Sequence, residues 1–317
     1  MEQNELIGPP ANRLVLPGNA LATQIPFANN SIMKITPQVG GAGCGCPAGA
    51  EGGGDPGGPA AYVFAIGKIE MRFPSLGVEK EFAQATGRAE TAGLTDQQAS
   101  ANVLSKPENR YLARLVCWVM TIEGLETYIL LPRDADGLNL LLSSVRPAED
   151  PRDIDVVIGI RGPVAPPELC NGLVLPMVVF DQVYSFDRDS LISAIPPPKA
   201  KLAAKDDKQF RTAAGELYDK VTQVADNAGA TDEHRALNYL AVRYPAIYGL
   251  ADRYGEDYAF TSVETGPSRL SGVRNVISVI FSFTNRKTDV TEKYFVRVDV
   301  TEEFPFLVSK LQPYYDH

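Results

Sequence analysis

A C-terminal stretch of alternating apolar and polar residues constrains the fold of this chain more than any other segment. In residues 290–300, one set of alternate positions is mostly apolar: Val290, Glu292, Tyr294, Val296, Val298 and Val300. The positions between them are mostly polar. A period of two predicts a strand with one buried and one polar face. Val273–Thr284 predicts the partner strand, and the turn Asn285–Thr288 joins the two as an antiparallel hairpin.

The segments before this hairpin alternate between strands and helices without a regular βαβ order. Tyr62–Phe73 predicts a strand, and Ser75 is placed to cap a helix over Leu76–Ala89. Pro176 interrupts a later apolar strand, which indicates a bulge or an edge position. Two amphipathic helices follow, the first with an apolar stripe at Phe210, Ala214, Leu217, Val221 and Val224. The fold class is therefore α+β: mainly antiparallel sheets with packed helices and a helical hairpin before a C-terminal β-hairpin.

Composition divides the chain into a tail and a domain. Residues 1–60 contain a run too rich in Gly, Pro and Ala to pack a core, QVGGAGCGCPAGAEGGGDPGGPAA. Residues 61–317 form the expected domain. Three prolines in Pro196–Lys201 favour an extended linker. Two sublobes, 61–195 and 202–317, are one arrangement that this linker allows.

Charge and hydropathy exclude some classes of partner. The 317 residues carry a formal net charge of -9, and the basic residues are scattered among acidic ones, which argues against binding to nucleic acid. No apolar run reaches the length of about 18 residues that a membrane helix needs. The N-terminal residues also lack the pattern of a signal peptide. We therefore expect no membrane contact and a cytoplasmic protein.

Four cysteines are the strongest candidates for a metal site. Cys44 and Cys46 are separated by one glycine, so that both thiolates can point at one Zn²⁺. Cys117 and Cys170 could complete a structural four-cysteine site. Because both lie in apolar strand contexts, the alternative is that they pack as small hydrophobic residues. A disulfide framework is not expected in a cytosolic protein of this length, and oxidation of the Cys44–Cys46 pair is a third, weaker reading.

The remaining chemistry-bearing residues give no catalytic constellation. His234 lies in the first turn of a helix, where a surface residue is the simpler explanation than an acid, base or ligand. Glu123 and Glu126 flank a turn, where a polar hairpin loop is the simpler explanation than acid–base chemistry. Arg297 is expected to pair with Asp299 or Glu292 across the hairpin, with a peptide-carboxylate pocket as the alternative. The sequence predicts no catalytic residue.

Three long segments resemble one known family. They are residues 268–316, ENRYLARLVCWVMTIEGLETYILLPRD and ELCNGLVLPMVVFDQVYSFD. All three are similar to the C-terminal domain of unknown function of the cyanobactin maturation proteases PatG and PatA, and more to the PatG version. The Cys-x-Cys in a Gly-rich lead-in also resembles that family. Those proteins take part in making ribosomal, post-translationally modified cyclic peptides. Their subtilisin-like protease domain has no counterpart here, so the chain reads as a standalone copy without a protease triad.

Two functions from different classes follow from this resemblance. The first is an accessory, non-catalytic domain that binds a precursor peptide or a partner enzyme, with an extended peptide adding to an exposed sheet edge. The second is a metal-dependent tailoring enzyme that acts on such a peptide through the Cys44 and Cys46 region. A homodimer formed through a sheet edge or the helical hairpin is a further arrangement to test.

Overall fold

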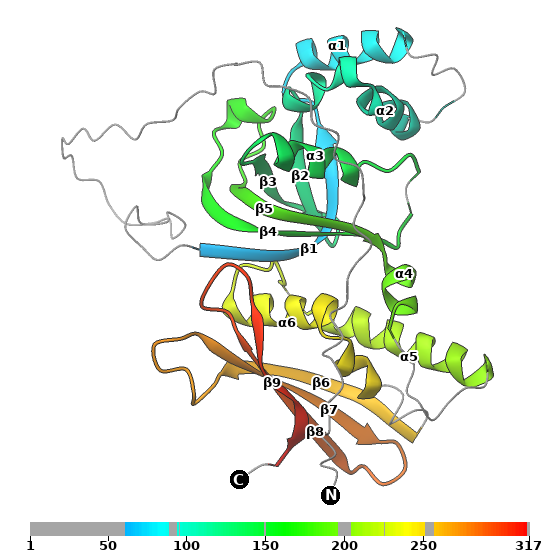
Figure 1. The fold of residues 1–317 in the computed structure, drawn as a ribbon, viewed down its shortest axis with the longest axis vertical. Helices are drawn as coiled ribbons and strands as arrows, with labels where there is room; N and C mark the ends of the chain where they lie inside the picture. The colour runs from blue at the N-terminus through cyan, green and yellow to red at the C-terminus, as the bar shows by residue number, and fades with distance from the viewer. Residues whose placement is uncertain are drawn as a thin grey trace, which may run out of the picture. The chain divides into compact units, whose positions relative to one another are not determined.

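The computed structural model describes residues 61–88, 94, 96–148, 150–195, 204–224, 226–250 and 257–315, all of which belong to one compact unit (Figure 1). The first part of the unit contains β1 (Ala61–Arg72), α1 (Leu76–Arg88), α2 (Asp96–Ser105), β2 (Cys117–Ile122), β3 (Leu125–Pro132), α3 (Ala135–Ser144), β4 (Asp153–Val164), β5 (Pro176–Asp187) and α4 (Arg188–Ser193). The second part contains α5 (Ala204–Thr222), α6 (Asp232–Arg243), β6 (Tyr258–Pro267), β7 (Val276–Asn285), β8 (Thr291–Asp299) and β9 (Phe306–Tyr314). Single 3-10 turns lie at Pro107–Asn109, Leu112–Arg114, Pro167–Leu169 and Pro245–Ile247.

The first five strands close into a barrel in the order β1-β2-β3-β5-β4. Four of the pairings are antiparallel, and β3 runs parallel to β5. Helices α1, α2 and α3 cover one side of this barrel and share an apolar core with it, which includes Phe82, Leu104 and Leu141. Gly159 lies at a register shift between β4 and β5, where a Cβ atom would stand 2.4 Å from the Val179 carbonyl oxygen. A glycine is needed at this close approach.

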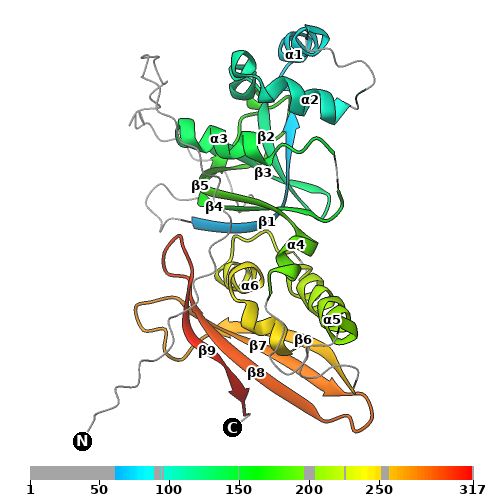
Figure 2. The same ribbon diagram turned by 45° about the vertical axis from the view of Figure 1, so that its right-hand side comes forward.

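Helices α5 and α6 lie between the barrel and the second sheet (Figures 1 and 2). One apolar core joins all three layers, and it contains Phe64 of β1, Leu240 of α6 and Phe281 of β7. Asn238 of α6 is fully buried, and its side-chain amide donates a 2.7 Å hydrogen bond to the Phe64 carbonyl. The backbone N–H of Phe64 donates to the Gly229 carbonyl at 2.9 Å. The second half of the chain therefore docks directly on the backbone of β1.

Strands β6, β7, β8 and β9 form an antiparallel meander with one face against α5 and α6. The expected alternation is confirmed for Tyr294, Val296 and Val298 of β8 and for Val300 just after it, which all belong to the buried core. Val290 lies before β8 and is exposed. The expected helical hairpin is also confirmed as α5 and α6. The Thr231 side chain caps α6 by accepting the His234 N–H, and Ser75 accepts the Val78 N–H at the start of α1. The α+β fold class is confirmed.

Some expectations were wrong or untested. Pro176 is the first residue of β5, which pairs with β3 and β4 on its two sides, so the edge alternative was wrong. The bulge alternative is confirmed, because the register between β4 and β5 shifts between Arg161 and Val164, the partner of Pro176. The first strand position is one that tolerates the missing N–H of proline. The tail 1–60 and the prolines of the linker lie outside the described residues, so the domain boundaries stay a prediction. None of the described helices combines the length and apolar character needed to cross a membrane.

Candidate functional site

A cavity of about 350 Å³ opens where β1 changes its neighbouring strand. The pairing of β1 with β4 ends at Gly67, and its pairing with β2 begins at Lys68. A Cβ atom on Gly67 would stand 2.3 Å from the Thr121 carbonyl oxygen, so the close crossing at this point depends on glycine. Beyond Gly67 the two strands β1 and β4 separate. The cavity lies at this fork.

The walls of the cavity come from five parts of the first half of the chain. Its lining consists of Lys68, Ile69, Glu70, Met71 and Arg72 of β1, Ser100 and Leu104 of α2, Trp118 of β2, Ser144, Val145 and Arg146 at the end of α3, and Asp150, Asp153 and Asp155 at the start of β4. A volume of this size is at the lower end of the range for small-ligand sites, and it fits one or two amino-acid side chains.

Asp155 holds the two separating strands together. Its carboxylate is fully buried and accepts hydrogen bonds from the Ile69 N–H at 2.8 Å, the Ser185 hydroxyl at 2.6 Å and the Arg146 guanidinium at 3.0 Å. The carboxylate thus replaces the next backbone partner that β4 would have offered to β1. Burial raises the pKa of Asp155, while Arg146, Ser185 and Ile69 favour its charged form. Hydrogen bonds from these three donors offset the cost of burying a charged carboxylate in an apolar strand.

The rim of the cavity carries charges of both signs. Arg146 also pairs with Asp153 at 3.3 Å, and the Lys68 ammonium donates to the Asp150 carbonyl at 2.9 Å. Arg72 bridges Glu70 at 2.6 Å and Glu126 at 3.0 Å. Hydrogen bonds from Arg152 hold the pKa of the Asp150 carboxyl well below its usual range. A rim with cations beside anions suits a ligand that offers both donors and acceptors, as a peptide does.

Trp118 belongs to the apolar part of the wall, with Ile69, Leu104, Met71 and Val145. It is the only tryptophan of the chain and is 3% exposed. Its indole N–H donates to the Ala113 carbonyl at 2.9 Å, which fixes the ring in place. Trp118 and Tyr128 belong to the apolar core, whereas Tyr111 is 45% exposed.

The predicted cysteine site is only partly visible. Cys117 of β2 and Cys170 are joined in a disulfide, with Cα atoms 5.9 Å apart and a sequence separation of 53. The expectation that these cysteines form no disulfide was therefore wrong. Both are buried among apolar residues, as their strand contexts predicted. Cys44 and Cys46 lie outside the described residues. A zinc site that includes them stays a prediction, and one that uses all four cysteines requires reduction of this disulfide.

The other candidates from the sequence do not come together. His234 is in the first turn of α6, where burial lowers its pKa. Glu123 lies in the β2–β3 turn with a positive φ of 50°, and Glu126 pairs with Arg72. No histidine or cysteine lines the cavity among the residues that the structure describes. No acid–base pair or nucleophile of the kind weighed from the sequence is assembled there.

The expected ion pair between Arg297 and Asp299 was also wrong. Asp299 pairs with Arg274 rather than with Arg297. The Arg297 guanidinium lies over the Phe295 ring, with its central carbon 4.7 Å from the ring centroid. Residues two apart on a strand share a face, so Arg297 can stack on Phe295 without crossing to another strand.

Sequence reasoning missed Lys68, Arg146 and Asp155. A signal for the last of these exists, because an aspartate inside the apolar run IDVVIGI is expensive to bury unless it has partners. The identity of those partners depends on where β1 leaves β4, which no local pattern reveals.

Comparisons with known proteins agree with this architecture. Residues 204–314, which span α5 to β9, match the family model described as PatG C-terminal. Residues 204–314 are therefore similar in sequence to the PatG C-terminal family. A solved structure of a PatG domain of unknown function has the same fold, with a TM-score of 0.66 and 18% sequence identity. That match covers 80% of this chain and 98% of the solved chain, so it extends well beyond the PatG C-terminal match into the barrel. A search among curated proteins gives no match.

Proposed function

We propose that the chain is a non-catalytic accessory domain that binds a precursor peptide, or a peptide segment of a partner enzyme, in the biosynthesis of ribosomally made, post-translationally modified peptides. The PatG C-terminal match supports the biosynthetic setting. The cavity at the fork between β1 and β4 supports peptide binding, and we assign the binding site to it.

The observation that carries this proposal is the open side of β1 next to the cavity. Residues Lys68–Arg72 pair with β2 on one side, and no described strand pairs with their other side. The Ile69 N–H points to that open side, where it meets Asp155. Met71 is two residues further, so strand geometry directs its N–H to the same side. An extended peptide could therefore add to this edge through main-chain hydrogen bonds.

Side chains of the added peptide would enter the cavity. The apolar wall around Trp118 suits an apolar side chain, and the Lys68 ammonium and the Arg146 guanidinium can reach polar groups of the peptide next to that side chain. When no peptide is bound, Lys68 keeps the Asp150 carbonyl as its partner, and Arg146 keeps the carboxylates of Asp153 and Asp155.

Trp118 allows a direct test, because it is the only tryptophan and it lines the cavity. The purified chain is titrated with the precursor peptide encoded beside its gene, chosen or changed to lack tryptophan, and the fluorescence is followed. We expect a saturable change. Lys68→Met keeps the aliphatic stem but removes the charge, and we expect it to weaken binding about 10-fold, as loss of one charge-assisted hydrogen bond does.

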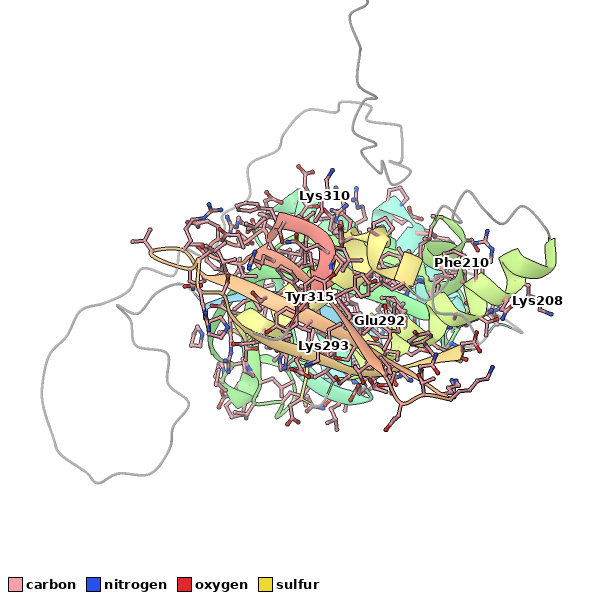
Figure 3. All side chains as sticks on the ribbon, turned by 90° about the horizontal axis from the view of Figure 1, so that it is seen from below. Lys208, Phe210, Glu292, Lys293, Lys310 and Tyr315 are labelled. Atoms are coloured by element: carbon pink, nitrogen blue, oxygen red, sulfur yellow. A yellow bond between two sulfur atoms is a disulfide. The ribbon has the colours of Figure 1, made fainter. Side chains whose placement is uncertain are left out.

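Lys208→Met is the matched control, since Lys208 of α5 is exposed, as Figure 3 shows, and does not line the cavity. Its affinity should equal that of the unmodified chain. Thermal unfolding of both variants separates a loss of binding from a loss of folding. A titration without a saturable signal, in fluorescence or in heat, would overturn the proposal.

A further inference from the structure

No described helix or strand covers the face of the second sheet opposite the one that packs on α5 and α6, and we call it the open face. In the view of Figure 3 this sheet lies in front of the helices, and Lys293 is labelled on it. The residues of β8 that enter the core are Tyr294, Val296 and Val298, so the alternate residues Lys293, Phe295 and Arg297 lie on the open face.

Apolar side chains form a line across the middle of this open face. Phe295 pairs in register with Ile280 of β7 on one side and with Gln312 of β9 on the other. Tyr314 is two residues beyond Gln312, and its ring meets Phe295 edge-on with centroids 5.7 Å apart. None of Ile280, Phe295 and Tyr314 is fully buried. The line therefore presents apolar surface to solvent.

Two cations flank this apolar line along β8. The Lys293 ammonium lies 5.9 Å from the Tyr314 ring centroid, and the Arg297 guanidinium lies over Phe295. The Arg297 Nε is buried and has no hydrogen-bond acceptor among the described residues. Lys293 and Arg297 are four residues apart on one face, which corresponds to about 13 Å at the usual rise of a strand.

The charge of the face favours a peptide over a nucleic acid. Arg274 is paired with Asp299, and the exposed Glu264 of β6, in register with Ile280, adds one carboxylate on the far side of the apolar line from β9. Two cations at a fixed spacing do not provide the basic stripe that a phosphate backbone needs, and the chain as a whole is acidic. They do match two carboxylates held at the same spacing, with an apolar side chain between them.

We infer that the open face of β6–β9 binds an acidic, extended peptide segment. The segment carries two carboxylate side chains four residues apart, which meet Lys293 and Arg297. An aliphatic or aromatic side chain midway between them packs on Phe295, Ile280 and Tyr314. This inference rests on the proposed function in taking a peptide as ligand, but it assigns a second surface that shares no residue with the cavity.

The test uses a synthetic, fluorescein-labelled peptide, acetyl-Gly-Glu-Ser-Leu-Ser-Glu-Gly-amide, with binding to the full chain followed by fluorescence anisotropy. We expect saturable binding that weakens as salt is raised, since exposed charges are screened. The same peptide with glutamine in place of both glutamates should bind at least about 10-fold more weakly, because it loses both charge-assisted contacts.

Variants of the chain test whether the acidic peptide binds at the open face. Arg297→Gln should weaken the acidic peptide about 5- to 10-fold, and Lys293→Gln provides a second variant if Arg297→Gln folds poorly. Lys287→Gln in the β7–β8 turn is the matched control, because Lys287 is exposed and lies beyond the strands; it should bind as the unmodified chain does.

Three results would overturn the inference: equal binding of the glutamine peptide, affinity unchanged in both Arg297→Gln and Lys293→Gln, or tighter binding of a single-stranded oligonucleotide than of the acidic peptide. The acidic peptide should leave Trp118 fluorescence unchanged, since Trp118 belongs to the cavity. If the cavity titration gave no signal but this acidic peptide still bound, only the cavity site would be rejected. The two proposals can therefore be tested independently.

Discussion

Asp155 shows how one buried carboxylate shapes the candidate site. It links β1 to β4 where the two strands separate by accepting from Ile69, Ser185 and Arg146, and the cavity begins next to it. The burial that raises its pKa would be costly without these donors. Asp155 therefore fixes the position of β1 at Ile69. Beyond this point β1 leaves β4, so one edge of residues 68–72 has no described strand beside it.

Replacing this carboxylate should destabilise the fold. Asp155→Ala leaves the Arg146 guanidinium without its most buried partner and Ile69 without an acceptor, so we expect a loss of about 3 kcal/mol in the free energy of unfolding. Urea unfolding measures this loss. Glu216→Ala on the exposed side of α5 is the control and should change stability by less than about 0.5 kcal/mol. A similarly small change for Asp155→Ala would contradict the role of Asp155.

At the scale of elements, the β8–β9 connection contacts the barrel through a pair of carboxyl groups. Glu303 lies in this connection, and Asp181 of β5 pairs with Arg133 at 3.0 Å. Burial, together with the hydrogen bond and the charge of Asp181, raises the pKa of Glu303 to about 7. The folded state thus binds a proton at Glu303 that the unfolded chain releases near its ordinary pKa of 4.5.

This difference predicts a pH-dependent stability. The contribution of protonated Glu303 is complete below about pH 4.5 and is lost as the pH rises through about 7. Glu303→Gln, which cannot ionise, should gain stability over the unmodified chain at pH 8 relative to pH 5. Because water screens the half-buried carboxyl, we expect about 1 kcal/mol, or a few degrees in Tm.

Thermal unfolding at the two pH values measures this difference. Glu264→Gln, at an exposed position of β6, is the control and should show the same offset at both. If Glu303→Gln also gave the same offset at pH 5 and pH 8, the account of Glu303 would be wrong.

The disulfide links β2 to the segment between β4 and β5, and it predicts the number of cysteines that react with a thiol reagent. Of the four cysteines, only Cys44 and Cys46 should react with a thiol reagent in protein unfolded without reductant. Reduction should expose all four and lower stability by up to about 4 kcal/mol, the chain-entropy value for a loop of this length. Four reactive thiols before reduction would contradict the disulfide.

Metal content tests the remaining cysteine expectation. If the chain purified without chelator contained one zinc ion, and the double variant Cys44→Ser with Cys46→Ser lost it, a thiolate site would be present. Four-cysteine ligation would then also require Cys117 and Cys170 in reduced form, against the disulfide. Absence of metal and unchanged folding in the double variant would end the zinc hypothesis.

Local pattern predicted the elements whose burial follows a simple period. The alternation in β8 and the apolar stripe of α5 each place one face against a common core, so both could be read from the sequence. Strand β9 was missed because Val308 and Phe306 are exposed and Pro313 breaks the pattern. An edge strand with little burial leaves no such period.

At the scale of the whole molecule, the closed barrel could not be predicted from local pattern. Its closure depends on the parallel pairing of β3 with β5, and its cavity on the change of partner by β1 at Gly67. Both are long-range events, and neither leaves a signal in the strands themselves. The family resemblance was predictable from long segments, whereas the cavity residues Lys68 and Arg146 have meaning only once the fork exists.

Hydrogen exchange of the intact chain, with and without the precursor peptide encoded beside its gene, tests the central claim most directly. The proposal predicts that the peptide slows exchange in residues 68–72, where the open edge of β1 gains main-chain hydrogen bonds, and leaves the β7–β8 turn unchanged. Saturable binding of the peptide without added protection in residues 68–72 would contradict peptide addition at β1.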